Sequence, residues 1–236
     1  MSYFSIRNLH AHYGKSHILH GVNFEMARGE MVAMLGRNGS GRSTAMKAIM
    51  GVLRPTAGQI ALDGVELAGT APHRINRAGI AYVPEERLVF DHLTVEENLM
   101  IGRAPKSAGR KSWSHEDMFA YFPRLKERRS VKAGSISGGE QQMLTLCRSL
   151  MSNPDLLLVD EPTEGLAPKI VEHLADVIAD INRQGVGAIL VEQKMTVAMR
   201  LCRRCLVMGH GRIVFDGTPD DLRQDAAIRK EWLEVA

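Results

Sequence analysis

The sequence predicts an α/β protein with a nucleotide-binding core, and three observations support this prediction. Predicted strands and helices alternate along much of the chain, as they do in α/β proteins. The apolar run at residues 31–35 leads directly into a glycine-rich stretch. A second apolar run, residues 156–159, ends in the carboxylates Asp160 and Glu161. Ligands of open α/β sheets bind at this edge, beyond the carboxyl ends of the strands.

The first part of the chain contains short elements. The strands expected there are residues 6–9, 22–26, 31–35, 59–62 and 80–83. The first two alternate apolar and polar residues, as half-buried strands do. The third is apolar throughout, which is typical of a buried strand in a mixed or parallel sheet. A helix is expected at residues 43–50 and ends at Gly51, while Pro84 ends the last strand.

The middle of the chain, from about Thr94 to Gly134, is polar and has a helical pattern. Residues 94–97 (Thr-Val-Glu-Glu) resemble a capping box, in which a hydroxyl and a carboxylate satisfy the free amides at a helix start. The apolar faces are assigned to Leu99, Met100, Phe119, Phe122 and Leu125. We expect one domain over residues 1–236, with a helical subdomain inserted at about residues 94–152.

After Gly134 the sheet pattern returns. Buried strands are expected at residues 156–159 and 188–191, with a helix at residues 168–183 between them. That helix carries its apolar residues on one face. Residues 205–216 predict a hairpin that turns at residues 209–211. An antiparallel edge therefore accompanies the main sheet.

Composition excludes several classes of protein. The 236 residues are 44% hydrophobic and 24% charged, which rules out a disordered chain. No apolar run approaches the roughly 18–20 residues that cross a bilayer, and the first residues lack the layout of a secretory signal. We therefore expect a soluble, cytoplasmic protein. The formal charge of +3 gives no support for a nucleic-acid partner.

Cysteines and histidines allow alternative interpretations. Three cysteines are too few for a disulfide framework. Cys202 and Cys205 form a single CxxC pattern, which could be redox-active or bind zinc, but its apolar flanks favour burial in the core. Four histidines lie close together: His10, His12, His17 and His20. Because no cysteine or carboxylate stands near them at ligand spacing, we interpret them as loop and strand-edge residues and expect no metal site there.

The glycine-rich stretch matches a phosphate-binding loop. It comprises Gly36, Arg37, Asn38, Gly39, Ser40, Gly41, Arg42, Ser43 and Thr44. The loop follows a strand and opens a helix, which is the context this motif requires. Glycines let successive backbone amides face one anion, and the helix start adds a favourable dipole. Ser43 can bind Mg²⁺, and Arg42 stands where the motif usually has lysine.

The second apolar strand delivers two acids to the same sheet edge. Asp160 is expected to hold Mg²⁺, directly or through water, and Glu161 to align the attacking water and accept its proton. The alternative is a strand that merely ends in acidic surface residues. The presence of a phosphate loop in the same chain favours the functional interpretation.

A further anion site is expected where residues 137–139 start a helix. Ser137, Gly138 and Gly139 present a hydroxyl and free amides at that start. Two phosphate-binding helix starts lie far apart in one sequence. This separation suggests that each contacts ATP in a different copy of the protein.

With these motifs in order, the chain resembles the ATP-binding subunits of ABC transporters over nearly its whole length. The resemblance implies a P-loop NTPase core of the ABC type with an antiparallel β edge and a helical subdomain. Residues 83–85, 93–99 and 160–168 resemble the branch that takes up branched-chain amino acids. Residues 16–22 are similar both to that branch and to its urea and short-chain amide relatives.

The resemblance also implies roles for single residues. Tyr13 matches the aromatic residue that stacks on adenine, although it could be an ordinary strand-edge tyrosine. Glu85 stands where a glutamine usually touches Mg²⁺ and senses the membrane subunit. Gln193 stands where a histidine usually contacts the γ-phosphate, and it can donate an amide hydrogen bond without titrating. Residues 163–166 match the loop that crosses between two copies.

The function implied is that of an ATPase on the cytoplasmic side of the inner membrane, where it drives an importer. Two such subunits, identical or related, would sandwich two ATP molecules with Mg²⁺ and dock on separate permease chains, with an external solute-binding protein acting indirectly. Arg42 is expected to retain binding but slow hydrolysis, because its planar fork aims differently from an ammonium.

Three alternatives remain open. The first is a subunit of low ATPase activity paired with an active homologue, and the second is an importer of urea or short-chain amides. The third is a soluble ABC ATPase that acts on DNA or ribosomes. It is disfavoured because the chain has neither a long coiled-coil insertion nor a second ATP-binding half.

Overall fold

Two β-sheets organise the chain in the computed structural model, which describes residues 2–105, 112–193 and 195–233. The smaller sheet is antiparallel, has the strand order β2-β1-β4-β5, and consists of β1 (Phe4–Tyr13), β2 (Ser16–Met26), β4 (Ala57–Leu62) and β5 (Val65–Glu66). The larger has the order β10-β9-β3-β8-β7-β6 and consists of β3 (Met31–Leu35), β6 (Ile80–Val83), β7 (Leu156–Asp160), β8 (Gly187–Val191), β9 (Arg204–Gly209) and β10 (Arg212–Gly217).

Five strands of the larger sheet are parallel, and β10 joins them as an antiparallel edge. Alternate side chains of β3 enter different cores: Met31, Ala33 and Leu35 pack on one face of the sheet, and Val32 and Met34 on the other. Burial on both faces explains why the sequence of this strand is apolar throughout.

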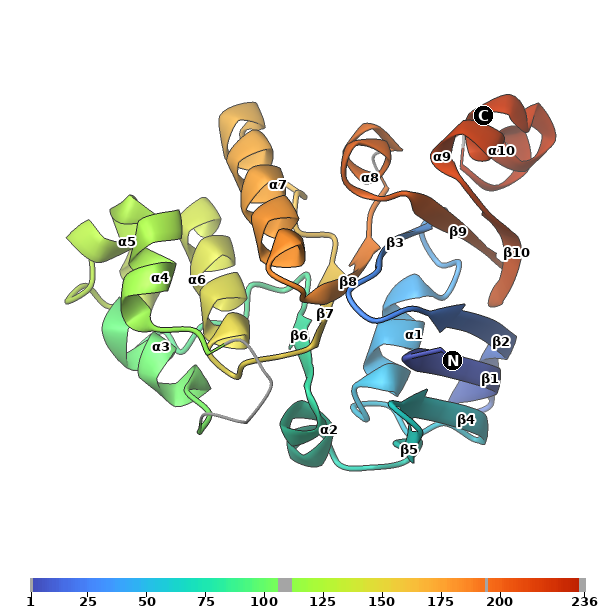
Figure 1. Ribbon diagram of the computed structural model, residues 1–236, viewed down its shortest axis with the longest axis horizontal. Helices are drawn as coiled ribbons and strands as arrows, with labels where there is room; N and C mark the ends of the chain where they lie inside the picture. Colours follow the sequence, from blue (N-terminus) through green and yellow to red (C-terminus); the bar gives the residue numbers. More distant parts are fainter. Residues whose placement is uncertain (1, 106–111, 194, 234–236) are drawn as a thin grey trace.

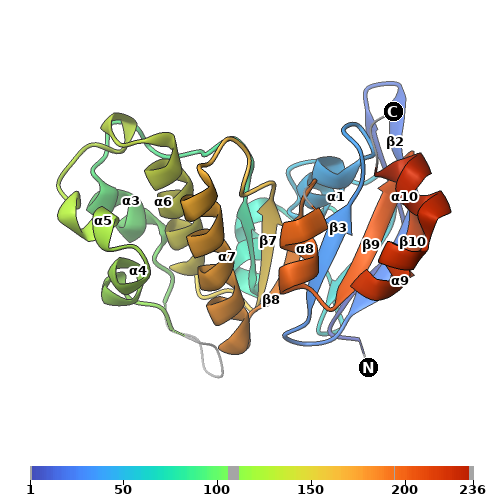
Figure 2. The ribbon, with the colours of Figure 1, turned by 90° about the horizontal axis from the view of Figure 1, so that it is seen from above.

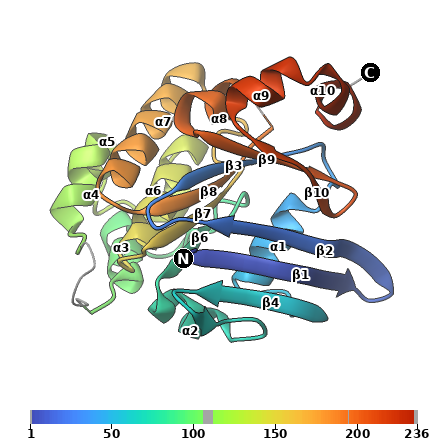
Figure 3. The same cartoon turned by 45° about the vertical axis from the view of Figure 1, so that its right-hand side comes forward.

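Helix α1 (Arg42–Ile49) lies between the two sheets, as Figure 3 shows. Its residues Ala45, Met46 and Ile49 are fully buried in the core that the smaller sheet closes. On the opposite face, α7 (Pro168–Arg183) and α8 (Met195–Leu201) cover the larger sheet (Figure 2). The predicted α/β architecture and its antiparallel edge are therefore confirmed.

A helical lobe extends from one end of the larger sheet (Figure 1). It consists of α3 (Val95–Gly102), α4 (His115–Tyr121), α5 (Pro123–Glu127), a 3₁₀ turn (Ala133–Ser135) and α6 (Gly138–Leu150). Thr94 and Glu97 form the predicted capping box at the start of α3. The remaining helices are α2 (Pro72–Ala78), α9 (Pro219–Gln224) and α10 (Ala226–Trp232).

One assignment within the lobe is wrong. Met100 was expected on an apolar face, but 59% of it is exposed, and Ile101 beside it is exposed as well. Helix α3 buries Val95 and Leu99, which lie one turn apart and share one face of the helix. Met100 therefore points away from the lobe core. The other four residues assigned to apolar faces are buried as expected.

The CxxC residues belong to the core. Cys202 and Cys205 are free and buried, and burial raises the pKa of the Cys205 thiol to about 11. A thiol with a raised pKa is a poor nucleophile and metal ligand. Within the part of the chain that the structure describes, no helix is long and apolar enough to cross a membrane.

The two tryptophans of the chain lie in different regions. Trp113 is buried in the helical lobe, where its backbone N–H donates to Asn153 Oδ1 at 2.8 Å. Trp232 ends α10 and lies against Gly209 at the end of β9. A Cβ on Gly209 would approach the indole ring to 2.4 Å, so no larger residue fits without movement. Residues 37–40 of the phosphate loop line the same small cavity as Trp232.

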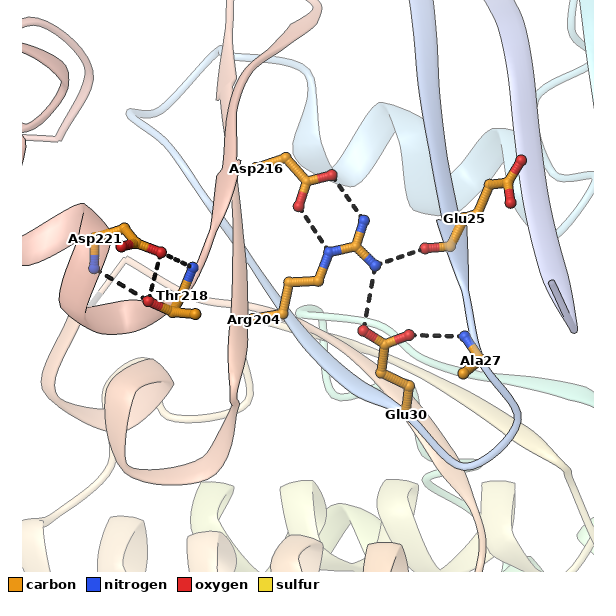
Figure 4. A network of polar contacts seen from close by, with 7 residues as sticks. All are labelled: Glu25, Ala27, Glu30, Arg204, Asp216, Thr218 and Asp221. Atoms are coloured by element: carbon orange, nitrogen blue, oxygen red, sulfur yellow. Dashed lines mark hydrogen bonds and ion pairs between the residues drawn. The ribbon is translucent and has the colours of Figure 1, made fainter. Parts of the chain in front are cut away.

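Arg204 connects several elements at the far end of the larger sheet (Figure 4). Its Nε and Nη2 both donate to the Asp216 carboxylate at 2.7 Å, and its Nη1 donates to the backbone oxygen of Glu25 at 2.8 Å. Nη1 also donates to Glu30 Oε1 at 3.2 Å, and Glu30 Oε2 accepts from the Ala27 amide. The bonds to Asp216, above all, raise the pKa of Arg204. One guanidinium therefore joins β9, β10 and the end of β2.

We predict that Arg204→Lys lowers the free energy of unfolding by about 1–2 kcal/mol, because an ammonium cannot make the two-pronged bond to Asp216. Urea unfolding measures the change. The matched control is Arg7→Lys, since Arg7 forms an exposed ion pair with Glu25 at 3.6 Å and should change stability by no more than about 0.5 kcal/mol. Equal effects of the two substitutions would contradict the connecting role.

Candidate functional site

The strand register brings the predicted site together. Val191 of β8 pairs with Met34 of β3 on one side and with Asp160 of β7 on the other. The phosphate loop and the acidic pair therefore leave the sheet at the same level. At the loop start, a Cβ on Gly36 would lie 2.5 Å from the backbone oxygen of Met208, so the close approach of two backbones there requires glycine.

A cavity of ≈ 370 Å³ opens at this edge. It is lined by Ile18, Asn38, Gly39, Ser40, Gly41, Arg42, Ser43, Thr44, Glu85, Glu161, Glu164 and Gln193. The Ser40 hydroxyl is buried and has no hydrogen-bond partner among the described residues. An unpartnered donor in a glycine-rich loop at a helix start fits an anionic ligand such as a phosphate group.

Asp160 is held by two hydroxyl groups. Ser43 Oγ donates to its Oδ1 at 3.2 Å, and the Tyr82 hydroxyl donates to its Oδ2 at 3.0 Å. Burial raises the pKa of Asp160, against the effects of the two hydrogen bonds and of Arg42. Sequence reasoning missed Tyr82. Tyr82 lies near the end of a strand that pairs with β7, and this position was the only feature that could have indicated its contact with Asp160.

Arg42 and Glu161, which both line the cavity, form a buried ion pair. Arg42 Nη2 lies 2.9 Å from Glu161 Oε1, and the two side chains are only 4% and 8% exposed. Arg42 also donates to Asn38 Oδ1 at 3.2 Å and to the backbone oxygen of Glu192 at 3.1 Å. Gln193 Nε2 donates to Glu161 Oε2 at 2.6 Å. The predicted phosphate-binding cation and the predicted base thus neutralise each other.

Glu161 has an unusual backbone conformation, and the pKa of its carboxyl group is raised. Its φ of 45° lies in the left-handed region, which costs a non-glycine residue on the order of 1–3 kcal/mol and is often found at functional sites. The bond from its amide to the Val191 backbone oxygen, 3.0 Å, holds this conformation. Burial raises the pKa of Glu161, while Arg42 and then Gln193 oppose the shift.

Three carboxylates converge beside the ion pair. One oxygen each from Glu85, Glu161 and Glu164 lies within 4.8 Å of the others, and no other trio of potential metal ligands in the described part of the chain converges in this way. Burial and the nearby Glu164 raise the pKa of Glu85. A divalent cation would relieve this repulsion. Glu164 was expected only in a loop that crosses between copies, so its place beside Glu85 was missed.

Other predicted site residues lie outside the cavity lining. Tyr13, at the end of β1, is 47% exposed. Ser137, Gly138 and Gly139 start α6 on the helical lobe, and the Glu140 carboxylate accepts bonds there from the Ser137 amide and hydroxyl at 2.8 Å. The chain's own acid is therefore bonded to Ser137 at the predicted second anion site. Arg37 lines the neighbouring cavity with Trp232.

The fold and site define a P-loop nucleotide-binding protein. The sequence profile of the family described as "ABC transporter" matches residues 19–164. The high-affinity branched-chain amino acid transport ATP-binding protein BraG of Pseudomonas aeruginosa is 42% identical, with 97% of this chain and 98% of that protein covered. The probable branched-chain amino acid transport ATP-binding protein LivF of Archaeoglobus fulgidus is 34% identical, with 94% of each covered.

A solved ATP-binding subunit of an ABC transporter superposes with a TM-score of 0.81 at 29% identity, covering 98% of this chain and 96% of that one. The chain therefore belongs to the ABC transporter family, as an ATP-binding, ATP-hydrolysing subunit. The predicted resemblance and fold type are confirmed.

We predict that Asp160→Asn raises the free energy of unfolding of the nucleotide-free protein by about 1 kcal/mol at pH 8, because it removes a desolvated charge. The pKa of Asp160 is higher in the folded protein than its ordinary value of 3.8 in the unfolded chain. The free energy of unfolding of the wild type therefore increases as the pH falls from the pKa of the folded state toward 3.8. The gain should therefore shrink at lower pH. Urea unfolding at several pH values measures it, and a gain that grows toward pH 4 would contradict the assignment.

Proposed function

We propose that this protein is the ATP-hydrolysing subunit of an importer, with branched-chain amino acids as the cargo. The observation that carries the enzymatic part is the cavity that the phosphate loop, Glu161 and Gln193 line together. Asp160 lies behind this lining and is bonded to Ser43, which is part of it. The cargo rests on the names of the two relatives, both of which are branched-chain amino acid transport proteins.

Each residue has a proposed role. The loop amides, Arg42 and the Ser40 hydroxyl bind the ATP phosphates, and Gln193 donates to the γ-phosphate. Ser43 and Asp160 hold Mg²⁺, for which hydroxyl and carboxylate oxygens are suitable ligands, and Glu85 lies close enough to Glu161 to contribute. The metal ion neutralises charge on the phosphates. Glu161 aligns the attacking water and takes its proton, and Tyr13 stacks on adenine.

ATP binding requires the central ion pair to open. While Arg42 is bonded to Glu161, it cannot direct the same N–H groups at a phosphate, and Glu161 cannot accept from water through Oε1. The incoming phosphate replaces the carboxylate as the anionic partner of Arg42. This exchange frees Glu161 for its role as base at the moment when substrate is present.

A second copy completes the site. Ser137, Gly138 and Gly139 lie on the helical lobe, outside the cavity that the phosphate loop lines. Their amides can reach the γ-phosphate of ATP on a partner subunit in a head-to-tail pair, which is either a homodimer or a pair with a related chain. The Glu140 carboxylate that now caps α6 would then share this helix start with a phosphate.

An apolar surface suits a separate membrane subunit. Leu88, Phe90, Met100 and Ile101 are all exposed, and they lie on α3 and on the loop before it. The Asn98 side chain fixes this loop by bonding both backbone groups of Phe90, at 2.9 and 3.1 Å. This surface is where the permease docks, which places the subunit peripherally on the cytoplasmic side of the membrane. The external solute-binding protein acts only through that permease.

The Arg42–Glu161 pair also supports an alternative function, a subunit that binds ATP but hydrolyses it slowly beside an active homologue. Both groups are committed to each other before ATP arrives, and a misplaced donor at a transition state costs about 10²–10³ in rate. Uptake of urea or short-chain amides is the alternative for the cargo. Transport by the reconstituted complex separates the two cargo classes.

We predict that Glu161→Gln lowers Mg²⁺-dependent ATP turnover at least 10²-fold while nucleotide binding is retained, because an amide cannot accept the proton of water. Turnover and binding of a fluorescent ATP analogue are measured on the same samples. The control is Glu116→Gln, an exposed residue of α4, which should leave both unchanged.

Turnover that persists in Glu161→Gln would refute the role of this residue as base. If the wild-type chain binds ATP without turnover, the low-activity alternative gains support, and the measurement is repeated with the membrane complex.

We predict that Arg42→Lys raises kcat about 10-fold or more, because an ammonium on a flexible stem can leave Glu161 and follow the phosphate. Steady-state ATP hydrolysis measures the change. Arg37→Lys is the matched control, since Arg37 lies in the same loop but outside the cavity lining. No gain, or a loss, in Arg42→Lys would show that the loop is adapted to arginine.

A further inference from the structure

A second cavity, of ≈ 260 Å³, lies beside the cavity that the phosphate loop lines. Its lining consists of Glu85, Glu86, Arg87, Gln142, Glu161 and Glu164. Three of these residues are the converging carboxylates described above. Neither Ser43 nor Asp160, which hold the Mg²⁺ of ATP in the proposed mechanism, belongs to this lining. The second cavity is therefore a separate place in which to look for a ligand.

Gln142 reaches this cavity from the helical lobe. It lies on α6 and is only 2% exposed. Both polar atoms of its side chain, Oε1 and Nε2, are buried and have no hydrogen-bond partner among the described residues. A buried polar group without a partner is costly, so a native protein normally supplies one, which can be an ordered water molecule or a bound ion. An amide oxygen is a common ligand of Ca²⁺ and similar cations.

The negative charge of the lining is only partly compensated. Two of its four carboxylates have a basic partner: Arg42 lies 2.9 Å from Glu161, and Lys47 lies 3.5 Å from Glu86. The other two, Glu85 and Glu164, form no ion pair with the residues that the structure describes. One divalent cation carries the charge that these two carboxylates lack.

Arg87 also lies in the lining, but its guanidinium is bonded to the main chain. Its Nη2 donates to the backbone oxygen of Glu164 at 2.8 Å, which leaves the carboxylate oxygens of this residue available to a cation. The positive charge of Arg87 repels a cation and lowers its affinity. Removing that charge should therefore strengthen binding, and this gives the site a diagnostic property.

The spread of the carboxylate oxygens fits a single ion. One oxygen from each of the three converging glutamates lies within 4.8 Å of the others. Ca²⁺ binds oxygen ligands at about 2.3–2.6 Å, which places two ligands on opposite sides of the ion about 4.6–5.2 Å apart. The three oxygens therefore lie within the span of one coordination shell.

We propose that the three converging carboxylates and the Gln142 amide oxygen bind one divalent cation of the Ca²⁺ or Mn²⁺ type in the nucleotide-free protein. Water completes the shell, and Gln142 Nε2 can donate to that water. Glu85 follows β6, Glu161 and Glu164 follow β7, and Gln142 belongs to α6. The ion therefore joins the helical lobe to the edge of the larger sheet. It is distinct from the Mg²⁺ of ATP, with which it shares only Glu85 as a ligand.

The test is titration of the untagged, nucleotide-free full chain with Mn²⁺, followed by electron paramagnetic resonance, with Ca²⁺ as a competitor. We expect one Mn²⁺ per chain, displaced by Ca²⁺. Glu164→Gln should lower the Mn²⁺ affinity about 10-fold or more, because it replaces a charged ligand with a neutral one. The matched control is Glu172→Gln, an exposed residue of α7, which should bind like the wild type. Unchanged affinity in Glu164→Gln would overturn the proposal.

Two variants test the other members of the lining. Arg87→Gln should raise the Mn²⁺ affinity about 3-fold or more, because it removes a repelling charge. Gln142→Leu should lower the affinity about 3-fold or more, while the metal-free protein unfolds at the same or a higher temperature, because leucine leaves no buried amide without a partner. Affinity that stays unchanged in both variants would place the ion outside this cavity and refute the site.

A last variant separates the two cation sites. Asp160→Asn should change the Mn²⁺ affinity of the nucleotide-free chain no more than about 2-fold, because Asp160 is not a ligand of this ion. A loss of about 10-fold or more would place the ion at the Ser43–Asp160 pair and overturn the proposal. Thermal unfolding in EDTA shows that each variant folds. All titrations are made without ATP, so their failure leaves the proposed ATPase function untouched.

Discussion

The parallel pairing of β3 and β7 with β8 between them is the constraint on which the site depends. Residues far apart in the sequence leave the sheet at one level because Val191 pairs with both neighbouring strands. Helix α1, which begins in the phosphate loop, is in turn fixed by its burial between the two sheets. A shift of one residue in this register would exchange the faces of β3 and move the acids away from the loop. Core packing and the geometry of the candidate site are therefore specified by the same hydrogen bonds.

Within this frame, the site gathers charges that the nucleotide-free protein must accommodate. Arg42 and Glu161 neutralise each other, whereas among the described residues Asp160 accepts hydrogen bonds from two hydroxyl groups. Breaking a buried ion pair by removing one partner is costly, because it leaves an unpaired charge. An incoming anion that takes over the arginine, together with a cation that binds the carboxylates, avoids this cost. Under the roles proposed above, nucleotide and metal ion would therefore bind together more favourably than either would alone.

Sequence patterns predicted the local features well. The strand at residues 31–35 and the helix at residues 168–183 have the observed bounds, because buried strands and amphipathic helices carry strong periodic signals. The motifs identified Arg42, Ser43, Asp160 and Glu161 as neighbours. The sequence could not show that Arg42 is bonded to Glu161, that Tyr82 supports Asp160, or that Met100 faces outward. Such features depend on side-chain directions and tertiary distances, which no periodicity in the sequence reveals.

The two tryptophans can serve as intrinsic fluorescent probes, one for the helical lobe and one for the region of the phosphate loop. The indole of Trp113 is enclosed by the helical lobe, while that of Trp232 lies against the strand end beside the phosphate loop. With one tryptophan replaced by phenylalanine, the emission of the other reports on its own surroundings. Movement of the helical lobe and rearrangement of the loop region can then be followed as separate signals in the same chain, without an attached dye.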